Sequence, residues 1–106
     1  MDWIEVCRLD EIAPGCSRRV AGTVPIALFN VDGEILATDD TCTHGQSSLC
    51  EGYVDGDVVE CAWHMAKFSI RTGKALSLPA VKPLRTYAVR VADGLVFIAQ
   101  ANLETA

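Results

Sequence analysis

Residues 26–37 read IALFNVDGEILA, and this stretch decides the kind of fold that the chain can adopt. Two apolar runs, 26–31 and 34–37, flank the dipeptide Asp32-Gly33. An Asp-Gly pair between two such runs is a strong signal for a β-hairpin with a two-residue turn. The stretch therefore predicts two antiparallel strands joined by a tight turn.

The same pattern recurs three times toward the C-terminus, with short turns at 55–57, 71–73 and 92–94. The flanking runs are 53–54 with 58–60, 67–70 with 74–76, and 87–91 with 95–98. In the run 87–91, Tyr87, Val89 and Val91 alternate with smaller or polar residues, as in a half-buried strand. Only residues 9–12 could form a helical turn, which Pro14-Gly15 would end. Four hairpins in succession predict an all-β fold of small antiparallel sheets or a partly open barrel.

Length and composition fit one globular domain that spans residues 1–106, with 50% hydrophobic and 22% charged residues. The net charge is −5, from 14 acidic and 9 basic residues, which argues against nucleic-acid binding. The apolar run at 26–29 is far shorter than the roughly 20 residues of a membrane-spanning helix. Residues 1–6 lack the features of a signal peptide. We therefore expect a cytoplasmic protein without membrane contact.

Cysteine and histidine residues cluster in two short segments. The chain has five cysteines, an odd number that argues against a disulfide scaffold, and only two histidines. The segments are Cys42-Thr43-His44-Gly45 and Cys61-Ala62-Trp63-His64-Met65. The hairpin predicted at 53–60 should bring them side by side, so that two thiolates and two imidazoles converge. Such a set of soft and borderline ligands predicts a metal site.

Two kinds of metal site fit these residue types. A Cys2His2 zinc site would stabilise a small fold, but zinc sites usually pair like ligands within one segment. Here each segment contains one cysteine and one histidine, which suits a binuclear iron–sulfur cluster with unlike ligands on its two irons. The spacing favours the cluster and leaves zinc as the alternative.

The paired motif resembles that of Rieske [2Fe-2S] proteins, and residues 39–91 resemble the soluble Rieske-type ferredoxins of bacterial aromatic-ring dioxygenase systems. The similar segments lie at 52–56, 59–61, 67–68 and 71–75, and the opening at 3–6 and the turn at 93–94 also fit. The resemblance implies a Rieske-type fold, in which a cluster-binding part at roughly 40–84 is inserted in a β base. It also implies that Cys42 and Cys61 bind one iron of the cluster, and that His44 and His64 bind the other.

The function that the resemblance implies is one-electron transfer from a reductase to the terminal oxygenase, without catalysis by this chain itself. If the cluster takes both histidines, none remains for the mononuclear iron of an oxygenase. The chain also lacks a G-x-G-x-x-G motif and a P-loop. We expect a monomer that docks transiently on both partners through complementary charge.

Three alternatives to this function stay open. One is a small Rieske-like subunit of another oxidoreductase, such as a nitrite reductase. The second is a zinc-stabilised interaction module, and the third is a Rieske-like scaffold that has lost its cluster. The sequence identifies neither the aromatic substrate of the system nor the class of its reductase.

The residues around the motif also predict the reduction potential. The high-potential Rieske proteins of respiratory complexes resemble one another in a disulfide across the two segments and in serine and tyrosine hydroxyls near the cluster. The corresponding positions hold Ser47, Trp63, Ala66 and Phe68. Because hydroxyl donors stabilise the reduced cluster, their absence predicts a potential near the low end of the Rieske range, on the order of −150 mV.

The remaining candidates are assigned simpler roles. Cys50 could be a resolving thiol or a ligand, but because the motif is complete without it we expect a packed or partly exposed free cysteine. Cys7 and Cys16 should pack, with a structural contact between the two as the alternative. Residues 78–80, Leu-Pro-Ala, should cover the cluster as the family's proline-containing loop does. Trp63 and Met65 should form an apolar rim that either touches a partner or shields the cluster from water.

Overall fold

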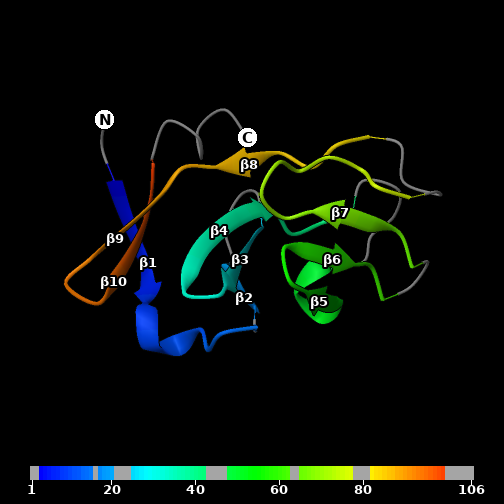
Figure 1. The fold of residues 1–106 in the computed structure, drawn as a ribbon. Coiled ribbons are helices and arrows are strands. Elements are labelled where there is room, and N and C mark those ends of the chain that lie inside the picture. Colours follow the sequence, from blue (N-terminus) through cyan, green and yellow to red (C-terminus); the bar gives the residue numbers. More distant parts are fainter. Residues whose placement is uncertain are drawn as a thin grey trace.

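The fold is a set of small antiparallel sheets in a computed structural model, which describes residues 3–15, 17–20, 25–42, 48–62, 65–77 and 82–99 (Figure 1). Within these ranges it contains short strands and two 3-10 helices. In chain order they are β1 (Trp3–Arg8), η1 (Leu9–Glu11), β2 (Ser17–Val20), β3 (Ile26–Val31), β4 (Glu34–Asp39), η2 (Leu49–Glu51), β5 (Tyr53–Asp55), β6 (Val58–Glu60), β7 (Lys67–Ser69), β8 (Thr86–Tyr87), β9 (Val89–Ala92) and β10 (Leu95–Ala99). The predicted all-β class is therefore confirmed.

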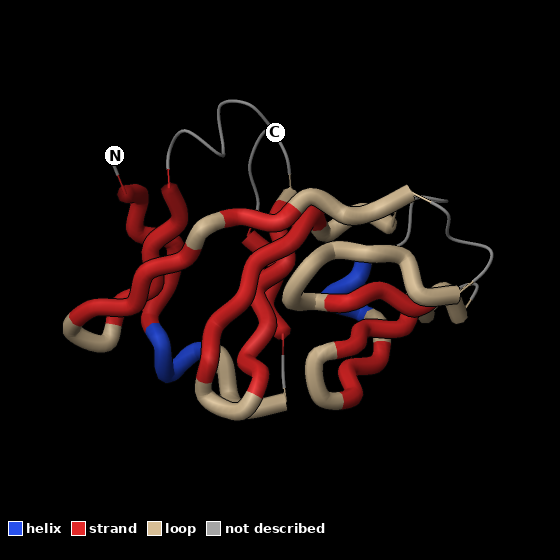
Figure 2. Tube along the Cα trace, turned by 45° about the horizontal axis from the view of Figure 1, so that its top comes forward, coloured by secondary structure: helices blue, strands red, loops and turns tan. Residues whose placement is uncertain are grey.

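The strands form three sheets that follow one another along the molecule, which measures 38 × 28 × 20 Å. One end sheet has the order β1-β10-β9, the middle sheet β2-β3-β4-β8, and the other end sheet β5-β6-β7 (Figure 1). Figure 2 shows the two 3-10 helices apart from each other, with η1 beside the first sheet and η2 beside the last. In chain order, the β5-β6-β7 sheet is inserted between the neighbouring strands β4 and β8 of the middle sheet.

Three of the four predicted hairpins are present in full. The pairs β3–β4, β5–β6 and β9–β10 are antiparallel, with their turns at the expected residues. Both residues of the first turn, Asp32 and Gly33, have positive φ angles of 52° and 92°. This is the backbone that a two-residue hairpin turn requires, and it explains why an Asp-Gly pair predicts the turn so well.

The third hairpin is present in a short form, because its second half is not an extended strand. The Ser69 N–H donates to the Lys74 carbonyl at 2.9 Å and the Leu76 N–H to the Lys67 carbonyl at 2.7 Å, on either side of an isolated antiparallel bridge between Phe68 and Ala75. Strand β7 pairs along its whole length with β6 instead. The turn at 71–73 is also bonded to a later segment, since the Gly73 carbonyl accepts a hydrogen bond from the Leu84 N–H at 2.7 Å.

The expected strand at 87–91 is also divided in two. Tyr87 pairs with Ala37 in the middle sheet as part of β8, whereas β9 begins at Val89 and belongs to the first sheet. Val91 is 42% exposed rather than buried. The chain thus passes from one sheet to the next at Ala88, and each half takes its burial from a different sheet.

Strand β3 explains how one short chain fills two cores. All six of its residues are buried. Ile26 and Leu28 belong to the core shared with the first sheet, while Ala27, Phe29 and Val31 belong to the core shared with the last sheet. Since successive side chains of a strand point to opposite faces, β3 is apolar on both sides and lies between two layers.

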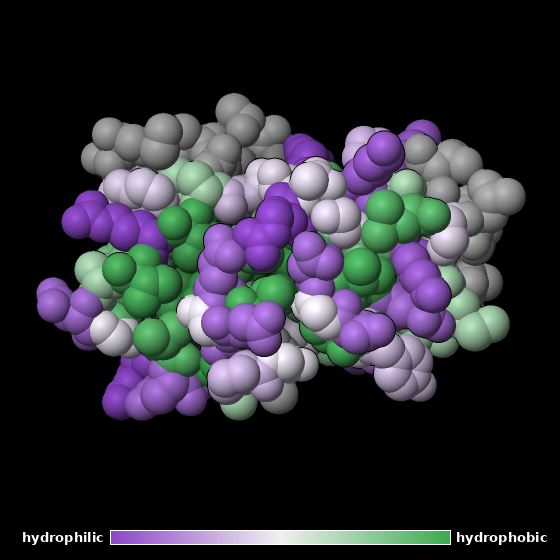
Figure 3. All heavy atoms as spheres, in the orientation of Figure 1, coloured by the Kyte–Doolittle hydropathy of each residue, from purple (hydrophilic) through white to green (hydrophobic). Residues whose placement is uncertain are grey.

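The outer surface of the molecule carries both polar and apolar groups (Figure 3). Figure 3 shows hydrophilic side chains over much of the visible face, with hydrophobic groups gathered at the end formed by β1, β9 and β10. The described part of the chain contains no helix of the length and apolar character needed to cross a membrane.

Candidate metal centre

The first motif begins directly after β4, where the chain leaves the middle sheet. Cys42 is 2% exposed. Thr41, directly before Cys42, forms an antiparallel bridge with Ser48. The carbonyl of Asp40 accepts a hydrogen bond from the Leu49 N–H at 2.7 Å. These bonds bring the two ends of segment 41–48 together, so that Cys42 lies at the base of a closed loop.

The second motif begins directly after β6. Cys61 is fully buried, and its N–H donates to the Ala66 carbonyl at 2.8 Å. The Cys61 carbonyl in turn accepts from the Met65 N–H at 2.9 Å. Met65 has a φ angle of 58° and is 67% exposed. These two backbone bonds join the ends of the loop, with Cys61 buried and Met65 toward solvent.

Both cysteines lie in the same apolar core, although 18 residues separate them in the sequence. The other buried members of this core are Ala27, Phe29, Val31, Leu49, Val59, Ala66, Phe68, Ile70 and Leu84. The β5–β6 hairpin and β7 supply its outer wall, and β3 supplies its inner wall. The structure thus brings together the cysteine half of the predicted ligand set in surroundings that exclude water.

Two backbone contacts at glycines hold these walls close. A Cβ atom on Gly52 would lie 2.3 Å from the Glu60 carbonyl oxygen, and one on Gly73 would lie 2.2 Å from the Leu84 carbonyl oxygen. Both distances are shorter than any real Cβ contact, so only glycine fits at either position without movement of the neighbouring backbone. The contacts fix β5 against the end of β6, and the turn after β7 against residue 84.

The positions that carry hydroxyls in high-potential relatives are apolar and buried here. Ala66 and Phe68 are both 0% exposed and belong to the same core as the two cysteines. Neither side chain can donate a hydrogen bond to a sulfur atom. The structure therefore places these two side chains, neither of which has a hydroxyl, in the core of the two cysteines.

The histidines of both motifs fall outside the described residues. This applies to His44 and His64, and also to Ser47, Trp63 and the segment 78–80. Within the part of the chain that the structure describes, no group of three or more potential metal ligands comes together. The ligand assignment of the two histidines stays a prediction.

Sequence reasoning missed Asp40, which is charged and only 2% exposed. Its carboxylate accepts hydrogen bonds from the Ser48 hydroxyl at 2.7 and 2.8 Å and from the Cys50 N–H at 3.1 Å. The Arg19 Nε lies 3.2 Å from the same carboxylate. The sequence shows two aspartates before the motif, but nothing local indicates that one of them is buried.

Its neighbour Asp39 is bonded in a different direction. The Asp39 carboxylate accepts hydrogen bonds from the Arg85 N–H at 3.3 Å and from the Tyr87 hydroxyl. Burial, followed by the bond to Asp39, raises the pKa of the Tyr87 hydroxyl. Asp39 thus joins β4 to β8, whereas Asp40 joins β4 to the loop of the first motif.

The cysteines outside the motifs are placed as packing residues. Cys7 is buried in the core shared by the first two sheets, and burial raises the pKa of its thiol. Burial, followed by the Asp40 carboxylate, raises the pKa of the Cys50 thiol to about 12. Neither is in a disulfide. A thiol that stays protonated at neutral pH is a poor nucleophile and a poor ligand; Cys16 lies outside the described residues.

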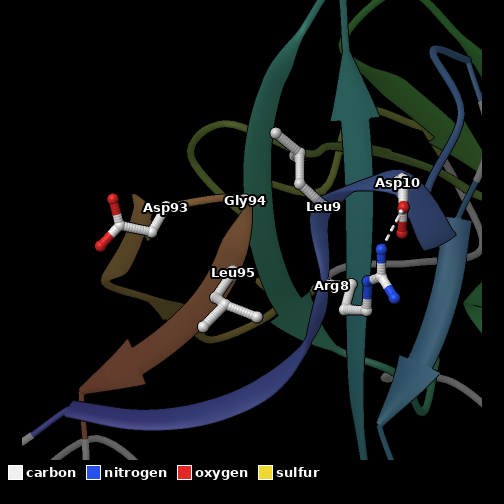
Figure 4. Close-up of a pocket in the computed structure, with 6 residues that line it drawn as sticks. All are labelled: Arg8, Leu9, Asp10, Asp93, Gly94 and Leu95. Atoms are coloured by element: carbon white, nitrogen blue, oxygen red, sulfur yellow. Dashed lines mark hydrogen bonds and ion pairs between the residues drawn. The ribbon is translucent and has the colours of Figure 1, made fainter.

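A surface hollow of about 630 Å³ lies at the opposite end of the molecule, in the first sheet (Figure 4). It is lined by Arg8, Leu9, Asp10, Asp93, Gly94 and Leu95. Arg8 and Asp10 form an exposed ion pair at 2.9 Å. Since its lining contains no serine, cysteine or histidine, the hollow has no nucleophile paired with a base, and we assign it no chemistry.

The donor chemistry around the cysteines fits an iron–sulfur cluster. Cys42 and Cys61 are both buried in one apolar core. Thiolates in a dry site are the ligands that iron–sulfur clusters take, and the lack of solvent lowers their potential. The described residues thus fit the cysteine half of a Cys2His2 cluster.

Comparison with known proteins gives the same result. Residues 2–88 match the model of the Rieske [2Fe-2S] domain. The chain is 50% identical to the 3-phenylpropionate/cinnamic acid dioxygenase ferredoxin subunit of Photorhabdus laumondii, over 92% of this chain and 94% of the relative. It is 49% identical to the biphenyl dioxygenase ferredoxin subunit of Pseudomonas sp. strain KKS102, over 97% and 98%.

Solved structures agree with these relatives. The chain is 43% identical to a protein in the complex of reduced oxygenase and oxidized ferredoxin of carbazole 1,9a-dioxygenase, with a TM-score of 0.87 and 92% coverage of both chains. It also resembles a nitrite reductase small subunit, with a TM-score of 0.80 at 24% identity over 93% of this chain and 99% of that one, which shows a shared fold alone. The family implies one Rieske-type [2Fe-2S] cluster per chain. This chain belongs to the Rieske [2Fe-2S] domain family, as a relative of dioxygenase ferredoxin subunits.

Proposed function

We propose that this protein is a one-electron carrier that passes electrons from a reductase to the terminal oxygenase of an aromatic-ring dioxygenase system. One structural observation carries the proposal: Cys42 and Cys61, from two separate loops, lie buried in one apolar core. The names of the relatives support the role, because they are ferredoxin subunits of dioxygenases at about half identity over nearly the whole chain.

We assign Cys42 and Cys61 as ligands of one iron and His44 and His64 as ligands of the other. The cluster-binding part then comprises roughly residues 40–84, inserted in a β base that spans the rest of the domain. When bound, the cluster accepts and releases one electron at a time. Within the second loop, Cys61 is buried and Met65 is 67% exposed, which supports a path for electrons on the histidine side.

The protein's own residues determine how that electron is held. The core around the cysteines excludes water, and Ala66 and Phe68 offer no hydroxyl to stabilise the more negative, reduced state. Both effects lower the reduction potential, because added negative charge is least stable in a dry site without donors. We therefore retain a potential near the low end of the Rieske range, on the order of −150 mV.

Charge and size suit transient docking. The chain carries a net charge of −5, so reductase and oxygenase surfaces with complementary positive charge would attract it from a distance. A monomer that leaves each partner quickly can shuttle between the two. The free thiols of Cys7 and Cys50 fit a reducing compartment, which supports a cytoplasmic location.

The ligand assignment is tested by a substitution that leaves the fold's core intact. In His64→Ala, we expect the visible absorption of the iron–sulfur cluster to be lost or replaced after anaerobic purification. The matched control is Cys7→Ala, which removes a thiol outside both motifs, in the core shared by the first two sheets, and should keep the spectrum. An unchanged spectrum in His64→Ala would refute the assignment.

The carrier role is tested by electron transfer between partners. With a dioxygenase reductase, NADH and a terminal oxygenase, addition of this protein should make oxygenase turnover depend on its concentration. His64→Ala protein should not support turnover, whereas Cys7→Ala protein should. Reduction by the reductase without delivery to any oxygenase, together with a stable complex with a large subunit, would favour the alternative of a subunit of another oxidoreductase.

A further inference from the structure

The buried carboxylate of Asp40 has no part in the ligand set, and its surroundings need an explanation. At 2% exposure it is one of the three polar or charged residues that are buried in the described part of the chain. Burying a charge is unfavourable unless hydrogen bonds and an opposite charge compensate for it. Asp40 has both, since Ser48 and Cys50 donate hydrogen bonds and Arg19 supplies the positive charge.

The hydrogen bonds from Ser48 and Cys50 reach across the loop of the first motif. Asp40 precedes Cys42 by two residues. The groups that donate to its carboxylate, the Ser48 hydroxyl and the Cys50 backbone N–H, follow the loop. The main chain of Asp40 contributes as well, through its carbonyl bond from the Leu49 N–H at 2.7 Å. One residue therefore ties the strand end before the loop to the 3-10 helix after it.

The two ligand loops include different kinds of bonds among their described residues. The second loop has two backbone bonds, between Cys61 and Ala66 and between Met65 and Cys61. The first loop has the Thr41–Ser48 bridge and, in addition, the hydrogen bonds of the Asp40 side chain. A buried carboxylate therefore contributes to the support of Cys42.

The positive charge comes from outside the loop. Arg19 lies on the edge strand β2, and its side chain is 55% exposed, while the Asp40 carboxylate is 2% exposed. Ser17 on the same strand donates its hydroxyl to the Cys50 carbonyl at 3.0 Å. Both β2, through Ser17, and Asp40 are therefore hydrogen-bonded to Cys50 of the 3-10 helix η2.

We propose that Asp40, with Arg19 as its counter-charge, is a positioning residue that fixes the first ligand loop and thereby the presentation of Cys42 to the cluster. The inference rests on the proposed ligand role of Cys42. Asp40 itself is not a ligand in this account. It acts through Ser48, Leu49 and Cys50, which set the path of the loop's far end.

The experiment compares Asp40→Asn with Asp39→Asn in the full-length, cluster-loaded protein. Asp39→Asn is a matched control, because it removes the same charge from the adjacent residue, the last of β4, whose bonds go to Arg85 and Tyr87. The first readout is the rate at which the visible absorption bleaches in excess iron chelator. The second is the electron paramagnetic resonance spectrum after reduction with dithionite.

We expect Asp40→Asn to lose its cluster about tenfold faster than wild type or more, the size of effect known for residues that orient metal ligands. Its resonance spectrum should shift or broaden, because Cys42 takes more than one position. Asp39→Asn should bleach at nearly the wild-type rate with an unchanged spectrum. Wild-type bleaching rates and spectra in both variants would overturn the proposal. Faster bleaching of the same size in both variants would overturn it as well.

Milder variants keep the test decisive if Asp40→Asn does not fold. Ser48→Ala removes only the hydroxyl that donates to both carboxylate oxygens, and Arg19→Gln removes only the counter-charge. Each should also speed cluster loss, and Arg19→Lys should restore part of the wild-type rate. Wild-type rates in both Ser48→Ala and Arg19→Gln would refute the role of Asp40. A wild-type protein that never holds an iron–sulfur cluster would instead refute the proposed function.

Discussion

Substitution of Gly73 by alanine should destabilise the cluster-binding end of the molecule far more than the same change at Gly56. Both glycines have positive φ angles, 78° and 61°, which cost an alanine about 1 kcal/mol each. A Cβ atom at Gly56 meets nothing within 4 Å, so this backbone cost is the whole effect. At Gly73 the Cβ atom would lie 2.2 Å from the carbonyl oxygen of Leu84, well below the 3.0 Å that real contacts keep.

The additional cost at Gly73 follows from what must move. Leu84 is 3% exposed in the core that contains both motif cysteines, and its N–H donates to the Gly73 carbonyl at 2.7 Å. Weakening that hydrogen bond costs about 1 kcal/mol, and disturbed core packing costs about another 1–3 kcal/mol. We therefore expect Gly73→Ala to lose about 3–5 kcal/mol in the free energy of unfolding, against about 1 kcal/mol for Gly56→Ala.

Urea titration measures this difference, with far-UV circular dichroism for the fold and visible absorbance for the cluster. The wild type and the two variants are incubated for the same time before each reading. Equal times make their midpoints comparable, because cluster loss makes unfolding irreversible. Gly73→Ala should unfold at a clearly lower urea concentration than Gly56→Ala and should lose its visible absorbance first. Equal midpoints for the two variants would refute the close packing of the turn after β7 on residue 84.

Three further predictions concern potential, pH and salt. Phe68→Tyr places a hydroxyl in the core of the two cysteines. If this hydroxyl donates a hydrogen bond that is worth about 1 kcal/mol more in the reduced state, the midpoint potential rises by about 40 mV. In the same redox titration, the control variant Phe97→Tyr in β10 should leave the potential unchanged. Because the pKa of Cys50 is about 12 when folded and 9.0 ordinarily, the folded state keeps a proton that the unfolded chain loses. The contribution of this thiol to the free energy of unfolding should therefore be fully present below pH 9 and be lost from pH 9 toward pH 12. In unfolding curves at increasing pH, Cys50→Ala should show a smaller loss of stability over this range than the wild type. The rate of reduction by a dioxygenase reductase should fall as salt rises, since the charge of −5 is then screened; a flat dependence in stopped-flow traces would exclude electrostatic steering.

The parts of the fold that the sequence predicts well are those with local causes. The turn at Asp32 and Gly33 needs two residues with positive φ, and an Asp-Gly pair between apolar runs supplies them. The same holds for the turns that join β5 to β6 and β9 to β10. In each case the residues that set the conformation lie within the turn itself.

The errors arise where a distant segment decides the outcome. The run after residue 73 pairs with β7 only over Lys74 to Leu76, because β7 forms its full ladder with β6. Tyr87 fits a strand with Val89, but its pairing with Ala37 places it in the middle sheet. Hydrophobic alternation identifies a strand without indicating which sheet it joins.

The candidate site shows the same division. The two motifs could be read from spacing, and the structure brings Cys42 and Cys61 into one core as the hairpin between them predicts. The burial of Asp40 could not be predicted locally, because its compensating partners are Arg19 and Ser48, on either side of it in the sequence. A charged residue next to a motif is ordinarily read as exposed, and only the folded chain reveals this one as part of the loop's support.

The central claim is that the chain holds a low-potential Rieske cluster, and a visible absorption spectrum of the anaerobically purified protein tests it most directly. The spectrum is recorded as isolated, after ascorbate and then after dithionite, with iron and zinc determined on the same sample. The account predicts a coloured, iron-containing protein that ascorbate leaves oxidised and dithionite bleaches. Bleaching by ascorbate would contradict the low potential, and a colourless, zinc-containing protein that takes up no iron–sulfur cluster on reconstitution would contradict the account as a whole.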